Sequence, residues 1–286
     1  MPRKLIGWAI AKLYSIAGAR RIALFKYKQQ GVVLSIFGHN PKPEVLDRLL
    51  SSLTRLGFKF LSTDQLIDNN YDGRHPYAWL TFDDGWYGFE EKLLPILRKY
   101  DVPATIFVAP GETERGSIWT NSVMGIVSDE EWQSWYALPA ADRYARVDAI
   151  LGSRSIIRQL APMDELQRLS KDSLITLENH TFSHLSCSSR PVCEVKTEVE
   201  SANAFIQNLT GRAPRLCCYP FGHWNKESDE CLKQAGLIPV KSDPGVMQLK
   251  EIGLYRNMFH DAMSNEENVG RVLGAWPKVR SPKNNH

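Results

Sequence analysis

The stretch that decides the fold is Tyr77-Ala78-Trp79-Leu80-Thr81-Phe82-Asp83-Asp84-Gly85. Its first six residues form a short run rich in apolar and aromatic side chains, which predicts a buried strand. Two adjacent carboxylates follow, and Gly85 allows the chain to turn sharply. Neighbouring side chains at a strand end point in different directions, so the two aspartates can serve different partners. An ordinary Asp-Asp-Gly turn is the alternative interpretation of this motif alone.

Strands and helices alternate on both sides of this stretch, which predicts βαβ units with a parallel sheet. About eight strands over some 250 residues favour a closed or nearly closed barrel over an open sheet. The predicted strands are 32–37, 58–62, 77–82, 104–109, 174–177, 216–219, 237–240 and 252–259.

Residues 113–172 break this rhythm, because they hold three tryptophans and mostly helical patterning. We interpret them as a helical insertion in a barrel that covers residues 31–275. Residues 1–30 form a predicted basic amphipathic helix, and residues 276–286 a flexible tail.

The formal net charge of +3 is divided unevenly along the chain. Residues 1–30 hold seven basic and no acidic residues, which leaves 28 basic against 32 acidic residues in the remainder. A mildly acidic body argues against nucleic acid as a partner. The basic arm could lie on an anionic membrane surface as a peripheral contact, or it could pack on the domain.

Cysteine usage indicates a reducing compartment. There are five cysteines, an odd number, and no CxxC pair, so a disulfide framework is not expected. We therefore expect a cytoplasmic location, with secretion as the less favoured alternative.

A second polar motif, His180-Thr181-Phe182-Ser183-His184, follows the predicted strand 174–177. Histidines four residues apart lie on one face of a helical turn, close enough to share a metal ion. Neutral imidazole suits zinc and other late first-row divalent ions. Two unrelated surface histidines are the alternative for this motif alone.

A third motif, Tyr219-Pro220-Phe221-Gly222, comes where the predicted strand 216–219 ends. Its proline and glycine force an irregular backbone, which can present N–H groups to an anion, although a plain strand-to-loop turn explains it equally well.

The three motifs together say more than each does alone. All fall at the carboxyl ends of predicted parallel strands, where βα barrels place their active sites. They offer two nitrogens and one carboxylate oxygen, a ligand set that leaves positions open as in a catalytic metal site.

TFDDG at 81–85, HTFSH at 180–184 and YPFG at 219–222, in this order, resemble the polysaccharide deacetylase family, whose members are also called NodB-homology domains or carbohydrate esterase family four. The resemblance covers roughly residues 32–262. It implies a distorted (β/α) barrel, here seven- or eight-stranded. It also implies a metal-dependent hydrolase that removes N-acetyl groups from an N-acetylated sugar of a polysaccharide or glycan precursor.

By this resemblance Asp83 would be the general base. Asp84, His180 and His184 would hold the metal, usually Zn²⁺, with Co²⁺ or another divalent ion able to substitute. The backbone N–H of Phe221 would stabilise an oxyanion, and Tyr219 and His39 would line the substrate site.

Two positions depart from the family pattern. Cys218 stands where many members carry an arginine that orients the base, and Arg256 is the expected substitute. The general acid is commonly a late histidine. His260 is the candidate here, with an ordinary surface histidine as the alternative.

Two other functions stay open, the first because of these departures and the second because the family resemblance does not fix the acyl group. One is a non-catalytic glycan-binding relative. The other is a metal-dependent hydrolase of another acyl group, such as a deformylase, an O-deacetylase or a cyclic amidase.

Overall fold

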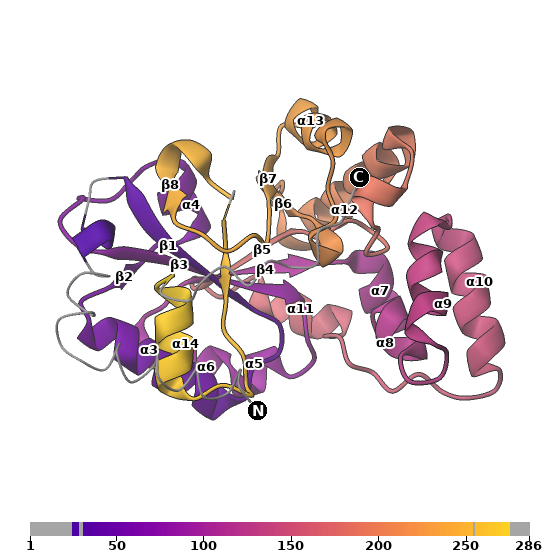
Figure 1. Cartoon of the computed structure of the whole chain (residues 1–286), viewed down its shortest axis with the longest axis horizontal. Coiled ribbons are helices and arrows are strands. Elements are labelled where there is room, and N and C mark those ends of the chain that lie inside the picture. Colours follow the sequence, from indigo (N-terminus) through magenta and orange to yellow (C-terminus); the bar gives the residue numbers. More distant parts are fainter. Residues whose placement is uncertain (1–24, 29–30, 254, 275–286) are drawn as a thin grey trace. The chain divides into compact units, whose positions relative to one another are not determined.

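The computed structural model describes residues 25–28, 31–253 and 255–274 (Figure 1). The predicted N-terminal helix over 1–30 falls largely, and the predicted tail over 276–286 entirely, outside the described residues, so both stay predictions. Among the residues described, no helix is sufficiently long and apolar to span a bilayer.

The chain divides into two compact units. The first comprises Met1–Leu80 and Ser242–His286, and the second comprises Thr81–Lys241. Strand β3 (Tyr77–Asp84) runs from the first unit into the second, so its aspartates belong to the second unit.

In the part of the first unit that the structure describes, strands are combined with helices that bury one face each. In α3 the buried residues recur at helical spacing, and Pro43 occupies the first turn, where its missing N–H costs no hydrogen bond. Strands β2 and β9 run parallel to β3 and β1, whereas β8 runs antiparallel to β1. The elements are β1 (Val32–Gly38), α3 (Pro43–Arg55), β2 (Lys59–Phe60), α4 (Thr63–Ile67), β8 (Met247–Gln248), η4 (Leu249–Glu251), β9 (Asn257–Met258) and α14 (Asn265–Val272).

The sheet of the second unit has the strand order β7-β6-β5-β4-β3. Strands β4 (Ala104–Val108), β5 (Ile175–Asn179), β6 (Leu216–Cys218) and β7 (Ile238–Val240) are parallel. Their register pairs Val108 with Asn179, and Asn179 with Cys217. The residues that follow β5 therefore emerge beside the carboxyl end of β6.

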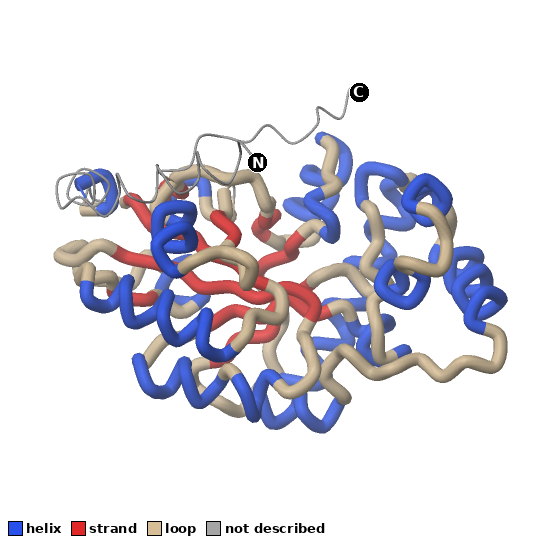
Figure 2. The backbone as a smooth tube through the Cα atoms, turned by 60° about the horizontal axis from the view of Figure 1, so that its bottom comes forward, coloured by secondary structure: helices blue, strands red, loops and turns tan. Residues whose placement is uncertain are grey.

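Helices fill the connections of this unit. Between β4 and β5, helices α7 to α10 gather beside one another (Figures 1 and 2) and enclose an apolar cluster that includes Trp119, Trp135 and Val147. The helices of the second unit are α5 (Phe89–Lys92), α6 (Leu94–Tyr100), α7 (Pro110–Arg115), α8 (Trp119–Val123), α9 (Asp129–Ser134), η1 (Trp135–Ala137), α10 (Ala140–Leu151), α11 (Met163–Leu169), η2 (Cys187–Ser189), α12 (Val192–Thr210), η3 (Pro220–Gly222) and α13 (Lys226–Gln234).

The predicted α/β alternation is confirmed, with differences in the first unit. Nine strands occur in the described part of the chain, because the sheet includes the two-residue strands β2, β8 and β9. The sheet is mixed, since β8 is antiparallel. The predicted strand 252–259 is mostly irregular, and only Asn257–Met258 pairs with β1.

Candidate metal centre

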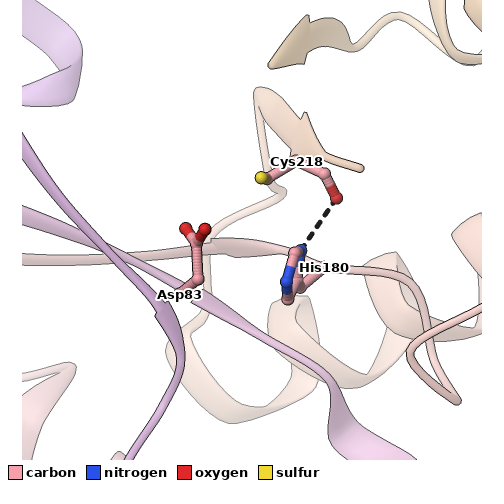
Figure 3. Close-up of side chains that lie close together, drawn as sticks. All are labelled: Asp83, His180 and Cys218. Carbon is pink, nitrogen blue, oxygen red and sulfur yellow. Dashed lines mark hydrogen bonds between the residues drawn. The ribbon is translucent and has the colours of Figure 1, made fainter. Parts of the chain in front are cut away.

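The two aspartates of β3 diverge at the end of the strand. Both are buried, Asp83 with 4% and Asp84 with 6% of its surface exposed. Asp84 has φ +77° and Gly85 has φ +73°, so the chain turns through two consecutive left-handed residues. A carboxylate oxygen of Asp84 faces the two histidines of the second motif, whereas Asp83 lies near His180 and Cys218 (Figure 3).

The segment from His180 to His184 is an irregular loop, so the predicted helical turn is wrong. The side chain of Asn179 accepts the Thr181 N–H (2.7 Å), and the Thr181 hydroxyl accepts the Leu185 N–H (2.9 Å). These local bonds compete with helical hydrogen bonds. Thr181 and His184 also have positive φ, which lies outside the α-helical range. The two rings nevertheless meet, with centroids 4.8 Å apart.

Both histidines direct Nε2 at one oxygen of Asp84. The distances to Asp84 Oδ1 are 3.5 Å from His180 and 3.3 Å from His184, and all three side chains are buried. Two imidazole nitrogens and one carboxylate oxygen are a donor set that could hold a metal ion and leave positions open for other ligands.

Hydrogen bonding fixes the orientation of His180. Its Nδ1 lies 2.8 Å from the Cys218 carbonyl oxygen, shown as the dashed line in Figure 3. A carbonyl only accepts, so Nδ1 carries the proton and metal ligation falls on Nε2. This outer contact is typical of metal-binding histidines and supports the fit of a divalent ion to the site.

The two histidines differ in their electrostatics. Burial lowers the pKa of His184 to about 4, so its ring is neutral at pH 7 and able to ligate a cation. Burial also acts to lower the pKa of His180, but the neighbouring Cys218 and the contact with Asp84 raise it well above its ordinary value.

The third motif covers His184 with an aromatic ring. Phe221 has φ +59°, and its ring centroid lies 4.4 Å from that of His184 and 4.8 Å from that of Tyr136. Tyr219 is 1% exposed and its hydroxyl donates to Asp229 (3.3 Å). This position in the core indicates packing and does not favour the predicted role of Tyr219 in substrate binding.

Backbone strain concentrates at this centre. Within the described residues six non-glycine residues have positive φ, and four of them belong to the three motifs: Asp84, Thr181, His184 and Phe221. Left-handed backbone is uncommon for bulky and β-branched residues.

The other predicted site residues lie in the first unit. His39 and His260 are exposed, and His260 Nδ1 accepts the Ala262 N–H (3.0 Å). Arg256 is buried, with its guanidinium 4.4 Å from the centroid of the Phe37 ring and 3.0 Å from the Ser242 hydroxyl. Their predicted roles stay predictions.

The sequence patterns missed the part that α10 takes in holding the loop. Arg143 is fully buried, and its Nη2 donates to both the carbonyl and the hydroxyl of Ser183, each at 2.7 Å. Glu198 on α12 accepts the Ser183 N–H (2.6 Å) and hydroxyl (2.8 Å). Trp119 Nε1 donates to the His184 carbonyl at 3.4 Å. Among 35 basic residues, no sequence signal marks Arg143 as buried.

Behind Arg143 lies a buried acid. Glu112 is fully buried, and its Oε1 accepts the Tyr144 hydroxyl at 2.8 Å. Burial raises the pKa of Glu112 to about 8, despite the opposing effects of Tyr144 and Arg143.

Comparison with known proteins fits this geometry. The family model described as polysaccharide deacetylase matches residues 70–240. The protein YxkH of Bacillus subtilis (strain 168), which carries a polysaccharide deacetylase name, is 19% identical over 198 residues, or 69% of this chain and 54% of YxkH. The chain thus spans about half the length of this curated relative.

Solved structures show the same fold. The deacetylase PplD of Streptococcus pyogenes, in complex with acetate, aligns with a TM-score of 0.62 and 18% identity, covering 85% of this chain and 99% of PplD. IcaB from Ammonifex degensii aligns with a TM-score of 0.60 and 15% identity, covering 86% and 98%. The α/β class and the distorted (β/α) barrel expected from the resemblance are confirmed. Because the family model matches residues 70–240, which is more than half of this chain, the chain belongs to the polysaccharide deacetylase family.

Proposed function

We propose that this protein is a metal-dependent hydrolase that removes N-acetyl groups from an N-acetylated sugar of a polysaccharide or glycan precursor. The observation that carries the proposal is the convergence of His180 Nε2 and His184 Nε2 on one Asp84 oxygen. Asp83 is the adjacent residue in the chain. Family membership supports the reaction class.

Asp84, His180 and His184 would hold the ion, for which zinc is the first candidate and cobalt a substitute. When bound there, such an ion would supply Lewis acidity toward an acyl carbonyl and toward a water molecule. The contact of His180 Nδ1 with the Cys218 carbonyl supports this role, because it directs His180 Nε2 toward Asp84.

Asp83 accepts the proton of the attacking water in this proposal. Its carboxylate lies near His180, in a group separate from that of Asp84, which is a suitable place for a base beside the ion. The Phe221 backbone N–H is the proposed oxyanion donor, and the proposed general acid and base-orienting residue are His260 and Arg256.

The test is an acetate-release screen over free, lipid-linked and polymeric N-acetyl sugars with added Zn²⁺. We expect chelation to abolish release and added Zn²⁺ or Co²⁺ to restore it. His180→Ala should abolish release, whereas His75→Ala, a histidine outside every group described above, should retain it. Bound metal without release from any acetylated glycan would favour the non-catalytic alternative. Release that is insensitive to chelation would contradict the proposal.

A further inference from the structure

A second group of metal-ligating side chains overlaps the first. One ligand atom each from Asp83, His180 and Cys218 lies within 4.8 Å of the other two, and all three residues are buried (Figure 3). Asp84 and His184 take no part in this group, and Cys218 takes no part in the other. The two groups therefore share only His180.

The strand register explains why the thiol is there. Asn179 at the end of β5 pairs with Cys217 on β6, so the next residues, His180 and Cys218, are neighbours across the sheet. The Cys218 carbonyl accepts the His180 Nδ1–H, which holds the cysteine backbone against the ring. The Cys218 side chain is fully buried, so its sulfur stays within the site and not in bulk solvent.

We propose that Asp83, His180 and Cys218 form a second, thiolate-containing position for a divalent cation. Its donor set is one sulfur, one nitrogen and one oxygen, whereas the Asp84 group offers two nitrogens and one oxygen. Thiolate is a soft ligand that prefers zinc and heavier thiophilic ions over magnesium, calcium or manganese. The second position therefore selects ions such as Zn²⁺ and Cd²⁺.

Occupation of the second position has a consequence that rests on the proposed function. A cation there takes His180 from the Asp84 group, so the two positions exclude each other. It also binds the Asp83 carboxylate, which then no longer accepts a proton from water. The second position is therefore an inhibitory one, filled when a thiophilic ion is in excess.

Cobalt reports thiolate ligation directly, because a thiolate bound to Co²⁺ adds a charge-transfer absorption in the near ultraviolet. The full-length protein, freed of metal with a chelator, is titrated with Co²⁺. We expect the band in the wild type and its loss in Cys218→Ser. Cys193→Ser is the matched control, because Cys193 is exposed and belongs to neither group, and it should keep the band.

The variant His184→Ala separates the two positions while leaving the thiol in place. It removes a ligand from the Asp84 group only, so the band should persist and reach saturation at lower Co²⁺. This arm also tests the proposal if Cys218→Ser fails to fold. A wild-type spectrum without the band, or a band that survives Cys218→Ser, overturns the second position.

The inhibitory consequence is measured separately, as inhibition by Cd²⁺ relative to each variant's own uninhibited rate. Cys218→Ser should require more Cd²⁺ for half inhibition than Cys193→Ser does, and equal requirements would contradict the inhibitory role. A cobalt band without deacetylase activity would refute the proposed function but not the second position. Activity without the band would refute the second position alone.

Discussion

The two histidines of the proposed metal centre are held by different parts of the second unit. His180 follows β5 directly, and its ring is oriented by the backbone of β6 through the Cys218 carbonyl. His184 lies four residues further on, and its surroundings come from helices: Trp119 contacts its carbonyl and Arg143 holds the preceding Ser183. The position of His180 thus depends on strand register, and we call His180 with β5 and β6 the sheet side. The position of His184 depends on the packing of the helices between β4 and β5, and we call His184 with Trp119 and Arg143 the helical side.

This difference shows what each kind of scaffold provides. The sheet side places a ligand with a single backbone contact, since parallel strands fix their ends relative to each other. On the helical side, the Arg143 guanidinium, the Trp119 indole and the Glu198 carboxylate together hold an irregular loop. We expect changes on the two sides to have separable effects.

The largest effect is expected at the end of β3. Asp83→Asn removes the proposed proton acceptor and keeps the side-chain volume, so deacetylation should fall roughly 10²- to 10⁴-fold. Zinc content should stay at the wild-type level, because Asp84, His180 and His184 are unchanged. Acetate release and metal analysis check this, and full turnover by the variant would contradict the role of Asp83.

On the helical side, we expect the largest effect from substitution of Arg143. Arg143→Met leaves the Ser183 carbonyl without its buried donor, so the loop loses its preferred position and zinc affinity should fall roughly 10- to 100-fold. Arg143→Lys should recover part of the loss. Arg146→Met on the same helix is the matched control, since Arg146 is exposed. Zinc dissociation constants measured by chelator competition test this prediction. Equal constants for the Arg143→Met and Arg146→Met variants would show that Arg143 does not hold the loop.

The buried acid behind Arg143 predicts a pH dependence. The pKa of Glu112 is about 8 in the folded protein against an ordinary value of 4.5. Between these values the folded state binds the extra proton, so the free energy of unfolding should fall as pH rises, by up to about 1.4 kcal/mol per pH unit. Urea denaturation at pH 6.5 and 7.5 measures the slope. Glu112→Gln should flatten it, and an unchanged slope in that variant would assign the dependence to another group.

The smallest effect is expected at Trp119. Trp119→Phe keeps the aromatic packing and removes the Nε1 contact with the His184 carbonyl, which at 3.4 Å is a long hydrogen bond. Zinc binding should weaken by less than about 1 kcal/mol. A loss as large as that of Arg143→Met would show that the indole, not the guanidinium, holds the loop.

The sequence predicts the sheet side well and the helical side poorly. Alternating strands and helices place Asp84 and His180 at the carboxyl ends of two strands of one sheet, β3 and β5, which flank β4. The irregular loop was missed, although Asn179 and Thr181 are residue types that bond their own backbone and thereby oppose a helix. Arg143 could not be found from the sequence, because its burial results from tertiary contacts among distant segments. Residues predicted in the first unit, such as Arg256 and His260, rest on the family resemblance alone.

The left-handed residues of the motifs bear on any attempt to make this protein resistant to heat. Each non-glycine residue held at positive φ costs on the order of 1–3 kcal/mol, which glycine would largely relieve. Laboratory selection for thermal resistance alone should therefore enrich glycine or asparagine at His184, whereas Phe221 and Thr181 have side-chain contacts that glycine would lose. Because His184 is a proposed ligand, selection for turnover should retain histidine there. The two kinds of selection should therefore favour different residues at this position.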